Sequence, residues 1–389
     1  MLSNPLLQVF SEWCRQVSSA ACRRQLIALL LVLTSLSGPL FAHHQTLRIG
    51  VFTSRSVDDA FWGPVEQFMQ AACDDLGIEL HVFYADGDHI ALIRQFETAV
   101  RSVPRFDALV LPNFKQTAHR NIKTAQDHQT PVLLFNSGLS AEHEAEMGKP
   151  RQRYHYWIGS ILPDEQQAGA DLLAWLLSKA QAINPAGVAL APLLAVGGNL
   201  ADFASIQRTL GMEQALARHR ELRLGQLVHA DWRRQLAATM FGRLVKRYPA
   251  DSAGSRIVWA ASDLMALGVL DGAEQAQVSV ITGGVDWTAE GLTSVLNGGL
   301  EVSFGGHFMD GGWAAVMLYD YFHGVDFADQ SLSFVTTMVP LSIDDKDLVN
   351  QLLDSQGWQQ VDFRRFSKVF SPSIKRYPFT PEAVFSQLH

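Results

Sequence analysis

The chain has few cysteines and few charged residues for its length. Only 3 of its 389 residues are Cys, and 18% are charged. Cys14 and Cys22 lie near the N-terminus, which leaves Cys73 alone in the remainder. A single cysteine forms no internal disulfide, and no Cys cluster is present that could hold zinc. The net charge of −8, without runs of Lys or Arg, argues against nucleic acid as the main partner.

The sequence also lacks the linear motifs of common catalytic and nucleotide-binding sites. It contains no GxGxxG, no GxxxxGK[ST], and no GxSxG, HExxH or SxxK motif. Its 13 His are scattered without the spacing of a metal site, apart from the adjacent pair His43-His44, which we interpret as a solvated terminus. The sequence therefore predicts neither an enzyme nor a bound metal or cofactor.

The N-terminal segment has the pattern of a secretory signal. Arg15, Arg23 and Arg24 precede the apolar run 26–33, and the small residue Ala42 follows it. The run is shorter than the about 20 apolar residues that span a bilayer. We therefore expect residues 1–42 to be a signal peptide cut near Ala42, and the rest of the chain to reside in the periplasm. An uncleaved membrane anchor is the alternative.

Strands and helices are predicted to alternate along two similar stretches of the chain. In the helix predicted over 61–76, the apolar residues Phe61, Val65, Phe68 and Ala72 recur every three or four positions. The first stretch has strands at 47–52, 80–84, 108–111 and 132–135, and further helices at 90–100 and 117–126. The second has strands at 156–159, 188–195, 222–229, 257–260, 278–282, 301–304 and 334–339, with helices at 164–180, 204–219, 233–246, 264–274, 289–297 and 309–322.

Alternation of this kind is typical of βαβ units on a parallel sheet that is covered on both faces. The sequence therefore predicts an α/β protein with two doubly wound lobes. The segment 344–389 is rich in aromatic residues, which indicates that it packs on one of the lobes instead of forming a disordered tail.

Polar and aromatic side chains follow many of the predicted strands. Ligands of open α/β sheets bind in the crevice beyond the carboxyl ends of the strands. Carboxylates, amides and Arg hydrogen-bond the hydroxyl groups of a sugar, and aromatic faces pack on its C–H groups. We therefore predict a site for a small neutral polyhydroxylated ligand between the lobes. The candidate ligand-binding residues are Asp59, Phe61, Trp62, Asn113, Asn136, Ser137, Phe203, Arg208, Ser262, Asp263, Asp286 and His307.

Several of these candidates also fit a purely structural role. Phe61 could be the first core residue of its helix, and Asp263 could cap the helix 264–274. Arg208 could hold its lobe through an ion pair, and His307 could be buried at the boundary between lobes. An amino-acid ligand, held by one Arg and one Asp, stays open as an alternative to a sugar.

A set of segments resembles the type I periplasmic solute-binding proteins, the ribose- and galactose-binding family. They are Asp59-Ala60-Phe61-Trp62, residues 131–136 (PVLLFN), residues 208–211 (RTLG), and the run 261–268 (ASDLMALG) followed by GGVD at 283–286. The resemblance covers about residues 46–340. Within the family, residues 154–169 and the long C-terminal segment are most similar to the LuxP-like receptors of the furanosyl signal autoinducer-2.

The comparison with LuxP-like receptors leaves the ligand open. Trp62, Asn136 and Arg208 fall where those receptors have ligand-contacting Trp, Asn and Arg residues. Their second Trp and late Arg have no counterpart near Val285 and Gly306. A site with Asp58 or Asp59 together with Asp286 is more similar to that of a pyranose or pentose binder.

The resemblance implies two lobes joined by three crossovers, near 160–162, 305–307 and 337–340, which close around the ligand by a hinge motion. The N-terminal lobe would comprise 43–161 plus 307–337, and the C-terminal lobe 162–306 plus 338–389. It implies a substrate-binding protein of an ABC importer, with an inner-membrane permease as partner. A receptor subunit that presents its ligand to a sensor kinase or chemoreceptor is the alternative, and a secreted α/β enzyme is a distant one.

Overall fold

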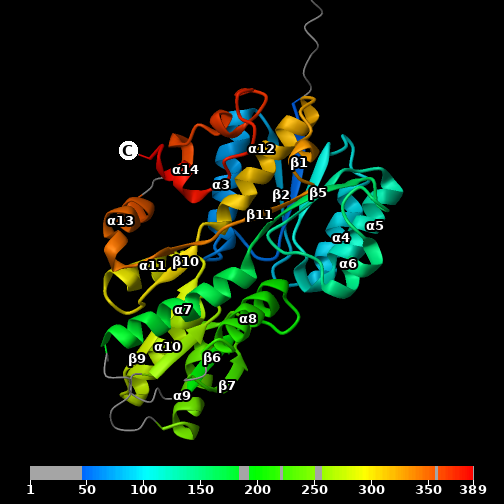
Figure 1. Cartoon of the computed structure of the whole chain (residues 1–389). Coiled ribbons are helices and arrows are strands. Elements are labelled where there is room, and N and C mark those ends of the chain that lie inside the picture. Colours follow the sequence, from blue (N-terminus) through cyan, green and yellow to red (C-terminus); the bar gives the residue numbers. More distant parts are fainter. Residues whose placement is uncertain (1–45, 184–191, 220–221, 250–255, 355–357, 389) are drawn as a thin grey trace, which may run out of the picture. The chain divides into compact units, whose positions relative to one another are not determined.

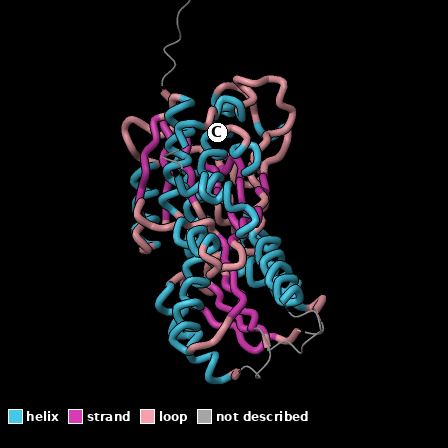
Figure 2. The backbone as a smooth tube through the Cα atoms, turned by 90° about the vertical axis from the view of Figure 1, so that its left-hand side faces the viewer, coloured by secondary structure: helices cyan, strands magenta, loops and turns pink. Residues whose placement is uncertain are grey.

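The computed structural model describes residues 46–388, apart from 184–191, 220–221, 250–255 and 355–357. The predicted signal peptide, 1–42, lies outside this range. The described residues form two six-stranded sheets that are flanked by helices (Figure 1). The backbone trace shows their strands as two separate groups (Figure 2). Each sheet and its helices form one lobe, named here the first and the second lobe.

The first lobe is built on a sheet with the order β11-β5-β4-β3-β1-β2. Its strands are β1 (Arg48–Thr53), β2 (Glu79–Tyr84), β3 (Ala108–Leu111), β4 (Val132–Phe135), β5 (Trp157–Pro163) and β11 (Ser333–Thr336). Its helices are α3 (Trp62–Leu76), α4 (His89–Ala99), α5 (Ala118–His128), α6 (Ala141–Met147) and α12 (Asp310–Phe322). Three short 3₁₀ helices accompany them, η1 (Phe114–Gln116), η2 (His307–Met309) and η3 (Phe327–Asp329).

The second lobe is built on a sheet with the order β12-β10-β9-β8-β6-β7. Its strands are β6 (Leu193–Gly197), β7 (Leu224–His229), β8 (Arg256–Ala260), β9 (Val280–Val285), β10 (Ser303–Gly305) and β12 (Val339–Leu341). Its helices are α7 (Glu165–Ile183), α8 (Phe203–Leu216), α9 (Arg234–Arg247), α10 (Asp263–Ala276) and α11 (Ala289–Leu296).

Strand pairing confirms the predicted fold class. All pairs in both sheets are parallel except β10 with β12, which is antiparallel. The central strands β3 and β4 are buried along their whole length, as expected where helices cover both faces of a sheet. None of the helices in the described ranges is long and apolar enough to cross a membrane.

The chain passes between the lobes at three places, as the resemblance implies. β5 of the first sheet leads directly into α7, and β10 of the second leads through Gly306 into η2 and α12. The third passage splits the strand predicted at 334–339 in two. β11 pairs with β5 in the first sheet, and β12 pairs with β10 in the second.

The C-terminal segment comprises η4 (Ile343–Asp345), α13 (Lys346–Asp354), η5 (Trp358–Gln360), η6 (Phe363–Phe366) and α14 (Pro381–Phe385). It packs largely on the first lobe, although the expected division assigned 338–389 to the second. Phe68 of α3 and Trp313 of α12 present an apolar surface, and Phe363 lies 5.0 Å from Phe68 between ring centroids. Covering this surface removes large aromatic side chains from water, which favours the observed position.

Candidate functional site

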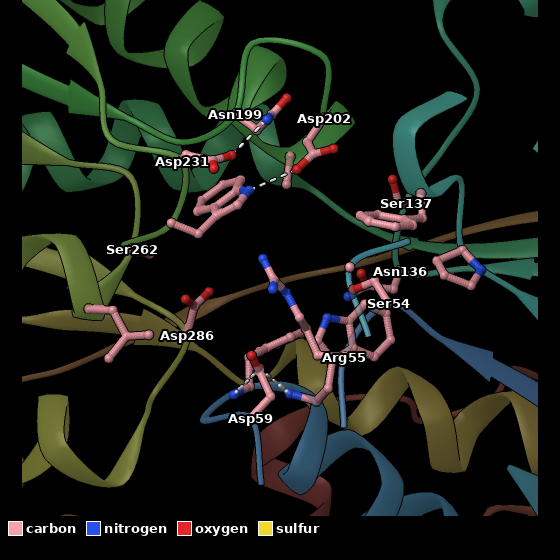
Figure 3. A pocket seen from close by; sticks show the side chains of 18 of the residues that line it. Ser54, Arg55, Asp59, Asn136, Ser137, Asn199, Asp202, Asp231, Ser262 and Asp286 are labelled. Atoms are coloured by element: carbon pink, nitrogen blue, oxygen red, sulfur yellow. Dashed lines mark hydrogen bonds between the residues drawn. The ribbon is translucent and has the colours of Figure 1, made fainter. Parts of the chain in front are cut away.

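A cavity of about 630 Å³ lies between the two lobes, at the carboxyl ends of their strands. Its wall includes loops that follow β1, β3 and β4 of the first lobe and β6 to β9 of the second. The volume is in the range of small-molecule sites. Figure 3 shows the carboxylates of Asp59, Asp231 and Asp286 around this space, together with the amide of Asn136.

The guanidinium of Arg208, on α8, is a buried charged group of the cavity. Its side chain is 3% exposed, and its Nε lies 2.5 Å from Oε2 of Glu165, which is 1% exposed. Nη1 donates to Oδ1 of Asp286 at 3.0 Å. Nη2 lies 3.2 Å from Nε2 of His307, which accepts because Arg only donates. Burial lowers the pKa of Arg208, but the charges of Glu165 and Asp286 outweigh it and raise the pKa above its usual value.

Two glycines allow the close helix packing that brings this ion pair together. A Cβ atom on Gly169 of α7 would lie 2.0 Å from the carbonyl oxygen of Arg208. A Cβ atom on Gly211 of α8 would lie 1.8 Å from the carbonyl oxygen of Gln166. Only glycine permits this approach of the two backbones, so the charged cluster depends on both positions.

The first lobe contributes aromatic rings at the start of α3. Oδ1 of Asp59 accepts the backbone N–H groups of Phe61 and Trp62, both at 3.0 Å, and so fixes the first turn. Phe61 stacks on the ring of His307 with 4.7 Å between centroids. Trp62 lines the cavity and meets Phe135 edge to face at 6.0 Å. Phe61 therefore holds His307, whereas Trp62 is part of the cavity wall.

The second lobe contributes Trp232, in the loop after β7. Its indole Nε1 donates to Oδ2 of Asp202 at 2.8 Å. The backbone of Trp232 has a φ of +60°, and a Cβ atom on Gly198 would lie 2.3 Å from its ring. The ring is thus clamped at the cavity wall. Trp62 and Trp232 line the same cavity from opposite lobes.

The two asparagines of the first lobe differ in what they can offer a ligand. Nδ2 of Asn113 donates to the carbonyl of Gly138 at 2.7 Å and to Oε1 of Gln116 at 3.2 Å, and its Oδ1 accepts from Ala118 N–H. Asn136 follows β4 with a φ of +60°, and within the described part of the chain its side-chain amide forms no hydrogen bond. Asn113 therefore shapes the loop, whereas Asn136 is free to bind.

A model of the periplasmic binding protein domain matches residues 49–324. The chain belongs to this family. A solved periplasmic sugar-binding protein from Pseudomonas fluorescens is 29% identical, with a TM-score of 0.77, over 87% of this chain and 99% of that one. No curated protein matches the chain.

More distant solved structures share the fold of this periplasmic binding protein. The binding component of the arabinose ABC transporter from Shewanella sp. ANA-3 is 17% identical, with a TM-score of 0.67, over 79% of this chain and 96% of that one. The Caulobacter myo-inositol binding protein is 15% identical, with a TM-score of 0.65, and the match covers 79% of this chain and 97% of that one. At these identities the likeness concerns the fold alone.

Most of the residues predicted for the site line the cavity of this periplasmic binding protein. They are Asp59, Phe61, Trp62, Asn113, Asn136, Ser137, Arg208, Ser262, Asp286 and His307. Phe203 and Asp263 do not. The ring of Phe203 packs against Gly138 of the opposite lobe, where a Cβ atom would lie 3.0 Å from Cζ. Phe203 is therefore part of the contact between the lobes.

Asp263 is a structural residue behind the cavity wall. It is fully buried, and its carboxylate accepts from the backbone N–H of Thr288 at 2.9 Å and from the hydroxyl of Ser303 at 2.7 Å. Burial, with the charge of Asp286, raises its pKa to about 8. A Cβ atom on Gly284 would lie 2.4 Å from Oδ1 of Asp263. Two of the segments that carry the resemblance, 261–268 and 283–286, therefore pack directly on each other.

The list of candidate ligand-binding residues did not include the other residues of the cavity wall. They are Ser54, Arg55, Asp86, Gly87, Pro112, Phe114, Lys115, Glu165, Asn199, Asp202, Ala204, Asp231, Trp232, Arg233, Leu264 and Thr288. Asp86 and Trp232 follow β2 and β7, so the rule on carboxyl ends of strands would have found both. Glu165 resembles an ordinary acidic residue in the first turn of a helix, and only the fold reveals its burial. Among the residues that the structure describes, no group of three His, Cys, Asp or Glu is placed to hold a metal ion.

Proposed function

We propose that the protein binds a neutral sugar in the cavity between its lobes and delivers it to an ABC importer in the inner membrane. The observation that carries the proposal is that the positive charge of Arg208 is compensated by neighbouring carboxylates. Arg208 faces two carboxylates, those of Glu165 and Asp286, so it has no uncompensated positive charge for an anionic ligand. Six carboxylates and four cationic side chains line the whole cavity, which further disfavours an anion.

The remaining groups suit the surface of a sugar. Oδ1 of Asp286 accepts from Arg208, which leaves lone pairs of this carboxylate for ligand hydroxyl groups. The amide of Asn136 can donate to one hydroxyl and accept from another. The indoles of Trp62 and Trp232 line the cavity from opposite lobes, and aromatic rings suit a sugar that presents C–H groups on its faces.

A role in import is supported by what similar structures are named to do. The arabinose-binding protein from Shewanella is named as a component of an ABC transporter, and a binding protein from Actinobacillus succinogenes with bound D-allose carries the same designation. The secretory pattern of the N-terminal segment fits a protein that meets its ligand in the periplasm. The proposal comprises binding and release, with no catalytic step.

Calorimetric titration tests the binding step. The purified protein is titrated with neutral pentoses, hexoses and inositols and, as matched anions, with the corresponding uronic acids. We expect saturable binding of at least one neutral sugar and none of its acid. The Asn136→Ala variant should lose most of the affinity, whereas Gln67→Ala, at an exposed position of α3, should retain it. Binding of an acid or an amino acid alone would contradict the proposal.

Uptake by cells separates import from sensing. Deletion of the gene should abolish uptake of the labelled sugar that the protein binds, and uptake of an unrelated sugar should stay unchanged. Normal uptake of the bound sugar in the deletion strain would contradict the importer role and favour a receptor subunit.

A further inference from the structure

The C-terminal helix α14, red in Figure 1, contacts Trp287 and Gly306. Each of these is the direct neighbour in the chain of a residue that lines the cavity. The ring of Phe385 stacks on Trp287, with 5.8 Å between centroids and 29° between planes. Trp287 directly follows Asp286. A Cβ atom on Gly306, which directly precedes His307, would lie 2.6 Å from Cγ of Pro381. One short helix thus supports the segments that carry Asp286 and His307, both of which contact the Arg208 guanidinium.

The segments that α14 supports have unusual backbone geometry. Asp286 has a φ of +126°, Trp287 of +54° and Gly306 of +101°. Non-glycine residues adopt positive φ only where the surrounding structure holds them there. Trp287 is 5% exposed, and its Nε1 donates to the carbonyl of Ser303 at 2.9 Å. Its backbone N–H donates to Oγ of Ser303 at 3.2 Å, and a Cβ atom on Gly305 would lie 2.3 Å from its ring. The ring of Phe385 stacks on it as well.

The position of α14 is set by the first lobe, not by the loops it supports. The hydroxyl of Tyr377 donates to Oδ2 of Asp320, a fully buried carboxylate on α12, at 2.9 Å. Phe379 stacks on Trp313 of the same helix, with 4.9 Å between centroids and 13° between planes. α14 is therefore an anchored support against which the loop 285–288 of the second lobe rests.

We infer that α14 positions Asp286 and His307 for ligand binding, and that Phe385 acts on the site through Trp287. The C-terminal segment lies beyond the family match at 49–324, and through these contacts it tunes the affinity of the cavity. The effect on affinity rests on the proposed function, whereas the support of the two loops does not.

Hydrogen exchange of the protein without ligand tests the support itself. Peptides that cover 284–291 and 303–309 are followed by mass spectrometry in the wild type and in Phe385→Ala. We expect faster exchange in both peptides and no change in the helices of the second lobe. Phe370→Ala is the matched control, because Phe370 is 45% exposed and stacks on Tyr319, away from these loops. Wild-type exchange in both peptides of Phe385→Ala would overturn the inference.

Affinity tests the consequence for the site. Loss of one aromatic stack should raise the Kd for the bound sugar about 5- to 10-fold. Phe385→Tyr should restore the Kd to within about twofold, because the stack is kept, and Phe370→Ala should leave it unchanged. An unchanged Kd in Phe385→Ala would refute the positioning role. If the wild type binds no sugar, the proposed function fails, while the exchange result still decides whether α14 supports the loops.

Discussion

The Glu165→Gln variant measures how much the fold depends on the buried ion pair. The substitution keeps the size of the side chain but removes one of the two charges that compensate Arg208. Both partners are almost fully buried, at 1% and 3% exposure, and their atoms lie 2.5 Å apart. Breaking a buried pair costs about 3–5 kcal/mol. Because Asp286 still faces the guanidinium, we expect a loss near the lower limit, about 3 kcal/mol.

Glu146→Gln is the matched control for this experiment. Glu146 pairs with Lys123 at 2.7 Å, but the two side chains are 53% and 41% exposed. Water screens such a pair, so its loss should leave stability almost unchanged. Urea unfolding of both variants provides the comparison. Equal losses in the two variants would refute the argument that burial determines the strength of the Glu165–Arg208 interaction.

The remaining predictions concern the cavity wall, pH and helix packing. Trp62→Ala and Trp232→Ala should each abolish detectable sugar binding by calorimetry while unfolding within about 1–2 kcal/mol of the wild type; retained affinity would remove that ring from the site. Asp263 has a pKa of about 8 when folded, against 3.8 ordinarily, so it holds a proton that the unfolded chain releases. Its contribution to stability is therefore present below about pH 4 and is lost as the pH rises through 8. The melting temperature of Asp263→Asn should depend less on pH over this range, and an unchanged pH dependence would contradict the assignment. Gly211→Ala should destabilise the second lobe by more than about 2 kcal/mol in urea unfolding, because its Cβ atom meets a backbone carbonyl; a neutral substitution would show that the helices can separate at no cost.

The sequence predicted the strands well where hydrophobic runs are short and bounded by polar residues. The segments 108–111 and 132–135 coincide with β3 and β4. The run 334–339 was predicted as one strand, because nothing in its residues shows that its two halves pair with different sheets. α6 was missed, since its residues AEHEAEM have no apolar stripe and only Met147 is buried. Whether such segments form a strand or a helix depends on contacts with residues that are distant in the chain.

The same limit applies to the site. Residue types at the ends of strands predicted much of the cavity wall, because parallel strands place their carboxyl ends at one edge. Asp263 was assigned to the ligand, although an Asp in this position suits a structural role equally well. Its role depends on Thr288 and Ser303, which lie 25 and 40 residues further along the chain. The pairing of Glu165 with Arg208 likewise requires the contact between α7 and α8, which no local pattern shows.

The most direct test of the central claim is a thermal-shift measurement on the purified protein. Neutral pentoses, hexoses and inositols are compared with uronic acids and amino acids at equal concentration. A ligand present at 100 times its Kd stabilises the folded protein by about 2.7 kcal/mol, which gives a clear rise in melting temperature. We predict this rise for at least one neutral sugar with the wild type, and its loss in Asp286→Ala. A rise with an acid or an amino acid alone, or an undiminished rise in Asp286→Ala, would contradict the account.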